Sequence, residues 1–137
     1  MAIITKDTPV GFELEGVKKQ ADIHLMGSRY WGRHNPLHWD PVFSVKQGLK
    51  APIQTGMMST HYIQEMLVNF FGEHFFQNAR FQVKYVKSVY SGDLVTTYGI
   101  VKEKTPEGKG YRFRLDVGAM NQDGTVVTTG SAEIHVE

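Results

Sequence analysis

Chemically capable side chains crowd into the stretch from Arg33 to His38. Two histidines, one asparagine and one arginine occupy six consecutive positions there. A neutral imidazole accepts a proton near neutral pH, so His38 is a candidate general base. Asn35 stands before Pro36, which biases it away from helical geometry, and its amide can bond to the local backbone. The spacing therefore predicts a rigid turn that holds His38 in one orientation.

Two other interpretations of this stretch remain open. In the first, the tryptophans of the loop and Leu37 pack it together, and the histidines have no chemical role. In the second, His34, His38 and Asp40 bind a metal ion, since histidines four residues apart share one face of a helix. Pro36 is unfavourable inside a helix and argues against that geometry, so we expect no metal site.

A long apolar segment follows and positions a second chemical group. Its hydrophobic side chains recur at steps of three and four residues, which predicts an amphipathic helix over residues 56–71 with Thr55 as N-cap and Gly72 as C-terminal stop. The first N–H groups of a helix lack intrahelical partners and lie at the positive end of its dipole. The N–H of Gly56 is therefore a candidate donor to a developing oxyanion. The apolar stripe consists of Met58, Tyr62, Ile63, Met66, Leu67, Phe70 and Phe71.

The C-terminal half alternates apolar and polar residues with period two, which indicates neighbouring antiparallel strands. The expected strands cover residues 80–87, 94–103, 111–117 and 125–136, with turns at 91–93 and 121–124 and a loop at 105–110. Upstream we expect an edge strand over 12–17, a short helix over 21–30, and a helix that begins at Asp40-Pro41 and ends at Gly48. These elements predict an α+β domain in which a sheet of four or five strands wraps one long helix.

Composition narrows the classes of function. The length of 137 residues predicts a single domain over residues 1–137, and 41% hydrophobic with 21% charged residues is typical of globular proteins. The net charge of +1 offers no clustered field for nucleic acid, and the lack of cysteine excludes disulfides and thiolate metal sites. No apolar run approaches the roughly 18 residues of a membrane span, and the first residues do not resemble a signal peptide. We expect a cytoplasmic protein that binds neither nucleic acid nor membrane.

The loop and the helix start together resemble the hydratase motif of MaoC-like (R)-specific enoyl-CoA hydratases and 3-hydroxyacyl dehydratases. The matching pieces are Gly32, Asn35-Pro36-Leu37-His38, Asp40-Pro41 and Pro52-Ile53-Gln54-Thr55-Gly56-Met57, and later segments such as Ser91-Gly92-Asp93 agree in order. The resemblance implies the hotdog fold, an antiparallel sheet wrapped around one long central helix, and a dimer whose two sheets join. It also implies a substrate that is an acyl thioester of coenzyme A or of a carrier protein. We expect no cofactor.

By this resemblance, His38 is the catalytic base, Asn35 orients the loop and Gly56 supplies the oxyanion N–H. The family carries an Asp five residues before the His, where this chain has Arg33, and usually a His before the Gly-Met, where this chain has Thr55. Arginine does not act as an acid or base at ordinary pH. The residues expected to bind substrate are Arg33, His34, Thr55 and Met57.

The departure at Arg33 leaves several hypotheses open. His34 or Asp40 replaces the acid, although Asp40 suits a helix cap better, or Arg33 binds a carboxylate or phosphate of the substrate. The leading hypothesis is a hydratase or dehydratase of fatty-acyl thioesters that forms a homodimer or a higher homo-oligomer. The alternatives are a catalytically degenerate subunit in a hetero-oligomer with an active hotdog dehydratase, and an acyl-CoA thioesterase on the same fold.

Overall fold

The computed structural model describes residues 2–26 and 34–137. In chain order the elements are β1 (Glu13–Leu14), β2 (Lys18–Gln20), the 3₁₀ turns η1 (Ile23–Leu25) and η2 (Pro36–His38), α2 (Pro41–Lys46), α3 (Gly56–Phe71), α4 (His74–Gln77), β3 (Ala79–Tyr85), β4 (Leu94–Glu107), β5 (Gly110–Met120) and β6 (Val126–Val136).

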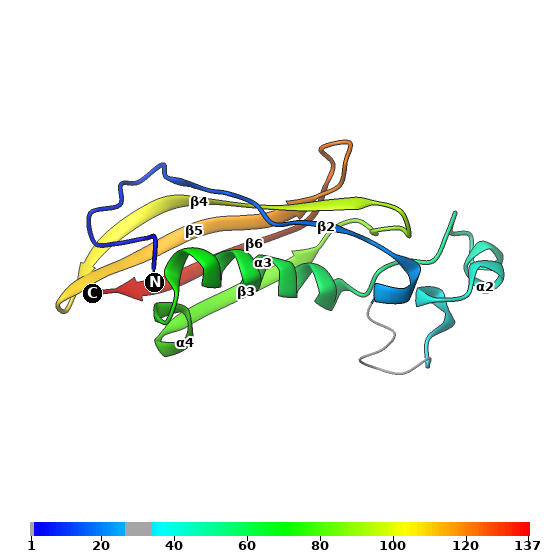
Figure 1. Ribbon diagram of the computed structural model, residues 1–137, viewed down its shortest axis with the longest axis horizontal. Helices are drawn as coiled ribbons and strands as arrows, with labels where there is room; N and C mark the ends of the chain where they lie inside the picture. Colours follow the sequence, from blue (N-terminus) through cyan, green and yellow to red (C-terminus); the bar gives the residue numbers. More distant parts are fainter. Residues whose placement is uncertain (1, 27–33) are drawn as a thin grey trace.

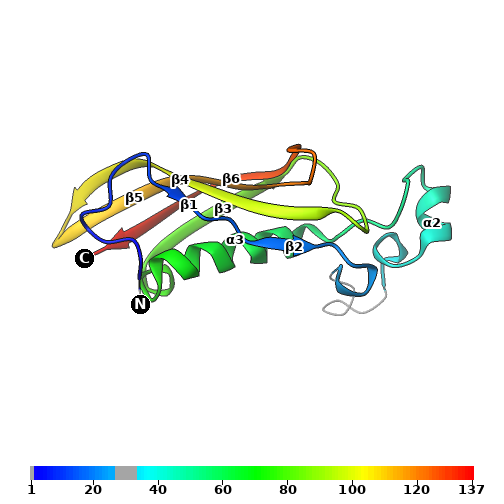
Figure 2. The same cartoon turned by 45° about the horizontal axis from the view of Figure 1, so that its top comes forward.

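One six-stranded sheet dominates the molecule. Its order is β1-β4-β5-β6-β3, with β2 paired to β4 beside β1, and every pair is antiparallel. Helix α3 lies along one face of this sheet, and its N-terminal end points toward α2 and the 3₁₀ turns (Figures 1 and 2). The arrangement confirms the predicted α+β architecture. The sheet has six strands, not four or five, because β2, which was not expected, pairs with β4 beside the short strand β1.

The core lies between α3 and the sheet. The side chains of Ile63, Met66, Leu67 and Phe71 are fully buried, and the ring of Phe71 meets that of Phe113 on β5 edge-on at 6.2 Å between centroids. Burial of these side chains, each stabilising by roughly 1.5–3 kcal/mol, fixes the helix against the sheet. The predicted helix bounds, 56–71, are those observed. None of the described helices is long and apolar enough to cross a membrane.

Three other predictions differ from the structure. The expected loop at 105–110 is a tight turn, because β4 continues to Glu107 and β5 begins at Gly110. Residues 21–30 contain only the 3₁₀ turn Ile23–Leu25 in their described part, and residues 27–30 lie outside it. Of the strand expected over 12–17, only Glu13–Leu14 forms, and the N–H of Val17 donates to the Thr97 hydroxyl at 2.8 Å instead of to a backbone carbonyl.

Helix α2 starts as predicted. The carboxylate oxygen Oδ1 of Asp40 accepts from the N–H groups of Val42 at 2.9 Å and Phe43 at 3.1 Å. These bonds satisfy two donors that have no intrahelical acceptor. Asp40 therefore acts as the N-cap of α2.

An Asp40→Ala variant should lose about 1 kcal/mol of unfolding free energy, because both capped N–H groups lose their acceptor. Urea denaturation followed by circular dichroism measures the loss. Asp123→Ala, which removes an exposed carboxylate from the 121–124 turn, is the control and should change stability by less than about 0.5 kcal/mol. Equal losses in the two variants would contradict the capping role.

Candidate active site

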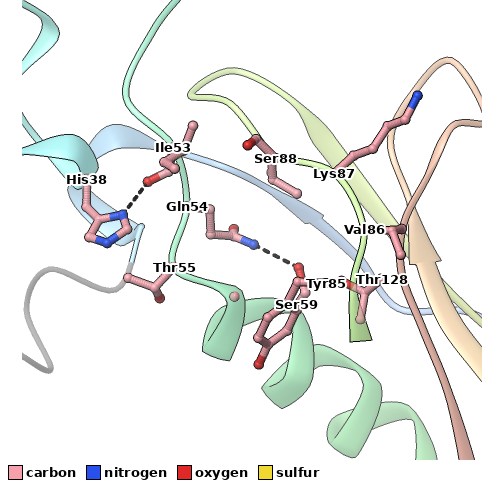
Figure 3. Close-up of a pocket in the computed structure, with 12 residues that line it drawn as sticks. His38, Ile53, Gln54, Thr55, Ser59, Tyr85, Val86, Lys87, Ser88 and Thr128 are labelled. Carbon is pink, nitrogen blue, oxygen red and sulfur yellow. Dashed lines mark hydrogen bonds between the residues drawn. The ribbon is translucent and has the colours of Figure 1, made fainter. Parts of the chain in front are cut away.

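A cavity of about 320 Å³ lies at the N-terminal end of α3 (Figure 3). Five parts of the chain meet there: η2, the segment that leads into α3, the first turn of α3, the end of β3 with the loop after it, and the start of β6. The residues that line it are His38, Ile53, Gln54, Thr55, Gly56, Ser59, Tyr85, Val86, Lys87, Ser88, Val89 and Thr128.

The ring of His38 is held by a backbone carbonyl. Its Nδ1 lies 2.8 Å from the carbonyl oxygen of Ile53 (Figure 3). A carbonyl only accepts hydrogen bonds, so Nδ1 carries the proton in this contact. In the neutral imidazole, Nε2 is then left with a lone pair that can accept a proton. This is the tautomer that a general base requires.

Hydrogen bonds within the His38 loop, and from it to neighbouring segments, hold this geometry in place. Asn35 Oδ1 accepts from the N–H of Leu37 at 3.1 Å, the local amide bond expected for a rigid turn. The N–H of Ile53 donates to the carbonyl of Leu37 at 2.9 Å, while the Ile53 carbonyl accepts from His38. The next residue, Gln54, donates its N–H to the carbonyl of Val89 at 2.7 Å. The His38 loop is therefore bonded to the segment that enters α3, and that segment to the β3–β4 connection.

Gly56 begins α3 on the wall of the same cavity. Its N–H has no acceptor among the described residues, as expected at the first position of a helix. The ring of Tyr85 packs against this glycine so closely that a Cβ added there would lie 2.6 Å from Cε2 of the ring. The Tyr85 hydroxyl is 2.7 Å from Oγ1 of Thr60, one turn along the helix. A side chain at position 56 would therefore require the ring or the helix start to shift.

Thr55 occupies the N-cap position, but the predicted capping bond is wrong, because its side chain makes no hydrogen bond to α3. Its N–H instead donates to the carbonyl of Met26 at 3.0 Å. The hydroxyl oxygen is buried and has no hydrogen-bond partner among the residues that the structure describes. It is a polar group on the cavity wall.

The other expected site residues lie apart from the cavity or outside the described chain. His34 and Asn35 are exposed and do not line it. Met57 is 39% exposed, and its sulfur lies 3.8 Å from the Tyr85 hydroxyl. Arg33 lies outside the described residues. Within residues 2–26 and 34–137, no group of three or more histidine, aspartate or glutamate side chains could hold a metal ion.

Several lining residues were missed by the sequence reasoning, among them Gln54, Ser59, Tyr85 and Thr128. Gln54 carried a weak signal, as a polar residue directly before the Thr-Gly that starts an apolar helix. Tyr85 and Thr128 carried none, since they come together as directly opposed residues of β3 and β6.

Comparisons with known proteins agree with this architecture. Residues 11–121 match the family model described as MaoC like domain. No curated protein matches the chain.

Among solved structures, the R-hydratase PhaJ1 from Pseudomonas aeruginosa in its unliganded form is 23% identical with a TM-score of 0.83, over 98% of this chain and 86% of that one. An (R)-hydratase from A. caviae involved in PHA biosynthesis is 21% identical with a TM-score of 0.78, over 96% of this chain and 98% of that one. A chain of the ChsH1-ChsH2 complex from Mycobacterium tuberculosis is 21% identical with a TM-score of 0.78, over 95% of this chain and 99% of that one. The chain has the hotdog fold and belongs to the MaoC-like hydratase and dehydratase family.

Proposed function

We propose that this protein is a hydro-lyase that adds water to the 2,3 double bond of an enoyl thioester and, in reverse, dehydrates a 3-hydroxyacyl thioester. The thioester is carried by coenzyme A or by a carrier protein. One observation supports this most: the imidazole of His38, held through Nδ1 by the Ile53 carbonyl, lines the same cavity as Gly56, whose N–H has no acceptor among the described residues.

The residues divide the chemistry between them. Nε2 of His38 takes a proton from water, whose oxygen forms a bond to C3 while the C2–C3 π electrons move toward the thioester. The thioester oxygen gains negative charge, which the N–H of Gly56 stabilises by about 3–4 kcal/mol. The proton on Nε2 returns to C2, so one water is added and His38 is regenerated. Arg33 cannot supply this proton, and we assign both transfers to His38.

The direct test is hydration of crotonyl-CoA, followed by loss of the ultraviolet absorbance of the conjugated thioester. Mass spectrometry should show a product heavier by one water with its thioester intact. Release of free thiol without hydration would instead identify a thioesterase. No reaction in either direction, with both CoA and carrier-protein thioesters, would refute the proposal.

A second candidate is a subunit that works only beside a catalytic partner. It is favoured by Arg33, and by the His38 ring, which has no acidic partner among the described residues. The solved complex of ChsH1 with ChsH2 provides a two-component precedent on this fold.

Arg33→Asp separates the two candidates. If the chain is a degenerate subunit, the wild type is inactive alone and the variant should gain about tenfold over background. The gain is small because a carboxylate introduced by a single substitution recovers only part of the roughly 10²- to 10⁴-fold that general acid–base catalysis contributes. A wild type that is active alone, and a variant that is no faster, would exclude the subunit role.

We also propose that two copies associate through their sheets. Strand β3 pairs with β6 on one side only within the described chain, and such an edge offers unpaired backbone groups to another strand.

A further inference from the structure

The buried wall of the cavity is polar. Eight polar or charged side chains are buried in the described part of the chain, and four of them line this one cavity. These are Gln54, Thr55, Ser59 and Thr128, which are 6%, 8%, 2% and 2% exposed. A pocket that binds a plain alkyl chain gains affinity from an apolar lining. Four buried polar side chains would lower that affinity, so this wall does not suit a plain alkyl chain.

Two atoms of this wall have no partner. The amide nitrogen Nε2 of Gln54 donates to Oγ of Ser59 at 3.0 Å (Figure 3). The other end of the amide, Oε1 of Gln54, and the hydroxyl oxygen of Thr55 are the buried side-chain polar atoms without a hydrogen bond among the described residues. A carbonyl oxygen accepts only, so Gln54 Oε1 requires a donor. Buried polar groups without a partner are rare and each calls for an explanation.

We propose that the substrate carries a hydroxyl group on a short acyl chain, and that this hydroxyl donates to Gln54 Oε1. This inference rests on the proposed function, which places the thioester between His38 and Gly56. The side chains of Lys87 and Ser88 form an exposed lip of the cavity, and the charged carrier remains there because burying its phosphates would be costly. The buried polar end is then left for the acyl group. The volume, about 320 Å³, lies at the low end of the roughly 300–1,000 Å³ of ligand pockets and suits a short chain.

Selectivity follows from the free acceptor. Water can bond to Gln54 Oε1 in the empty cavity, and a ligand hydroxyl can replace that bond. A methyl or methylene group would displace the water and leave the acceptor unpaired. The site should therefore bind a hydroxylated acyl group about tenfold more tightly than its deoxy counterpart.

Calorimetric titration with unreactive saturated thioesters tests this without turnover. The pairs are butyryl-CoA and 4-hydroxybutyryl-CoA, pentanoyl-CoA and 5-hydroxypentanoyl-CoA, and hexanoyl-CoA and 6-hydroxyhexanoyl-CoA. They are titrated into the wild type and Gln54→Leu. A double variant, Gln54→Leu with Ser59→Ala, removes both partners of the hydrogen bond between these side chains. Neither partner is then left unpaired, which guards against misfolding. Gln77→Leu, at an exposed position of α4, is the matched control.

The wild type and Gln77→Leu should prefer at least one hydroxylated member by about tenfold, and both Gln54 variants should lose that preference. The inference is overturned if the wild type binds every pair equally, or if the double variant keeps the preference. It is also overturned if the Gln54 variants weaken the binding of all six ligands alike. In that case Gln54 would accept its hydrogen bond from the pantetheine part of coenzyme A, which all six ligands share. Selective binding without any reaction of CoA or carrier-protein thioesters, in either direction, would refute the proposed function and keep this inference, whereas hydration without selectivity would refute this inference and keep the proposed function. No binding of any thioester would refute both.

Discussion

Replacing His38 by asparagine should slow the hydration of crotonyl-CoA by roughly 10²- to 10⁴-fold, the usual contribution of a positioned base. The side-chain amide of asparagine can donate to the Ile53 carbonyl much as Nδ1 does at 2.8 Å, so the loop keeps its anchor. What the variant loses is the lone pair of Nε2. We expect the loss in kcat with KM nearly unchanged, because the missing interaction acts only in the transition state.

His135→Asn is the matched control. This histidine is near the C-terminal end of β6, does not line the cavity, and has its Nε2 2.9 Å from the carbonyl oxygen of Glu107. The C-terminal end of β6 lies at the far end of the sheet from α2 (Figure 1). The control should hydrate crotonyl-CoA at the wild-type rate. Unfolding midpoints show whether each protein is intact. A folded His38→Asn protein with at least a third of wild-type kcat would exclude His38 as the base.

The long periodic elements of this fold could be predicted from sequence because many residues contribute to each signal. Helix α3 was expected at 56–71 and is found there, since four fully buried side chains along it repeat at helical spacing. Short elements gave no such signal. Helix α4 has four residues, about one turn, and was not predicted.

The hairpin between β4 and β5 shows how local chemistry can mislead. Pro106 and two nearby glycines indicated a loop, yet Pro106 is paired with Tyr111. Strands β1 and β2 pair with β4 only between Leu94 and Ile100, so the far part of β4 is an edge. Proline is tolerated on an edge strand because no second neighbour needs its missing N–H.

In the candidate site, too, residues close together in sequence could be predicted and contacts between distant segments could not. The proximity of His38 and Gly56 was implied by one motif within a stretch of some twenty residues. The part of the cavity wall formed by Tyr85 and Thr128 was not, because these two residues meet only through the register of β3 with β6. That register is set by packing of the whole sheet against α3. Such packing leaves no trace in the spacing of residues along the chain.

Alanine at position 56 should lower kcat/KM by roughly 10²- to 10³-fold, the usual cost of losing one oxyanion donor. Helix propensity favours alanine over glycine, so the backbone itself gives no reason for a loss. The added methyl would lie 2.6 Å from Cε2 of Tyr85, well inside contact distance. Withdrawal of the ring would break the bond of its hydroxyl to Thr60 at 2.7 Å. We therefore expect the helix start to shift as well, and the N–H to shift with it.

A double-mutant cycle with Tyr85→Ala isolates that cause. In Gly56→Ala with Tyr85→Ala, the methyl occupies the space of the ring, and the N–H returns to its place. The double variant should therefore recover most of the activity of Tyr85→Ala alone, which means a strong coupling between the two positions. Full activity in Gly56→Ala would exclude the N–H as the oxyanion donor. A double variant no faster than Gly56→Ala would contradict the steric explanation, because the methyl would then block the thioester itself and not the ring.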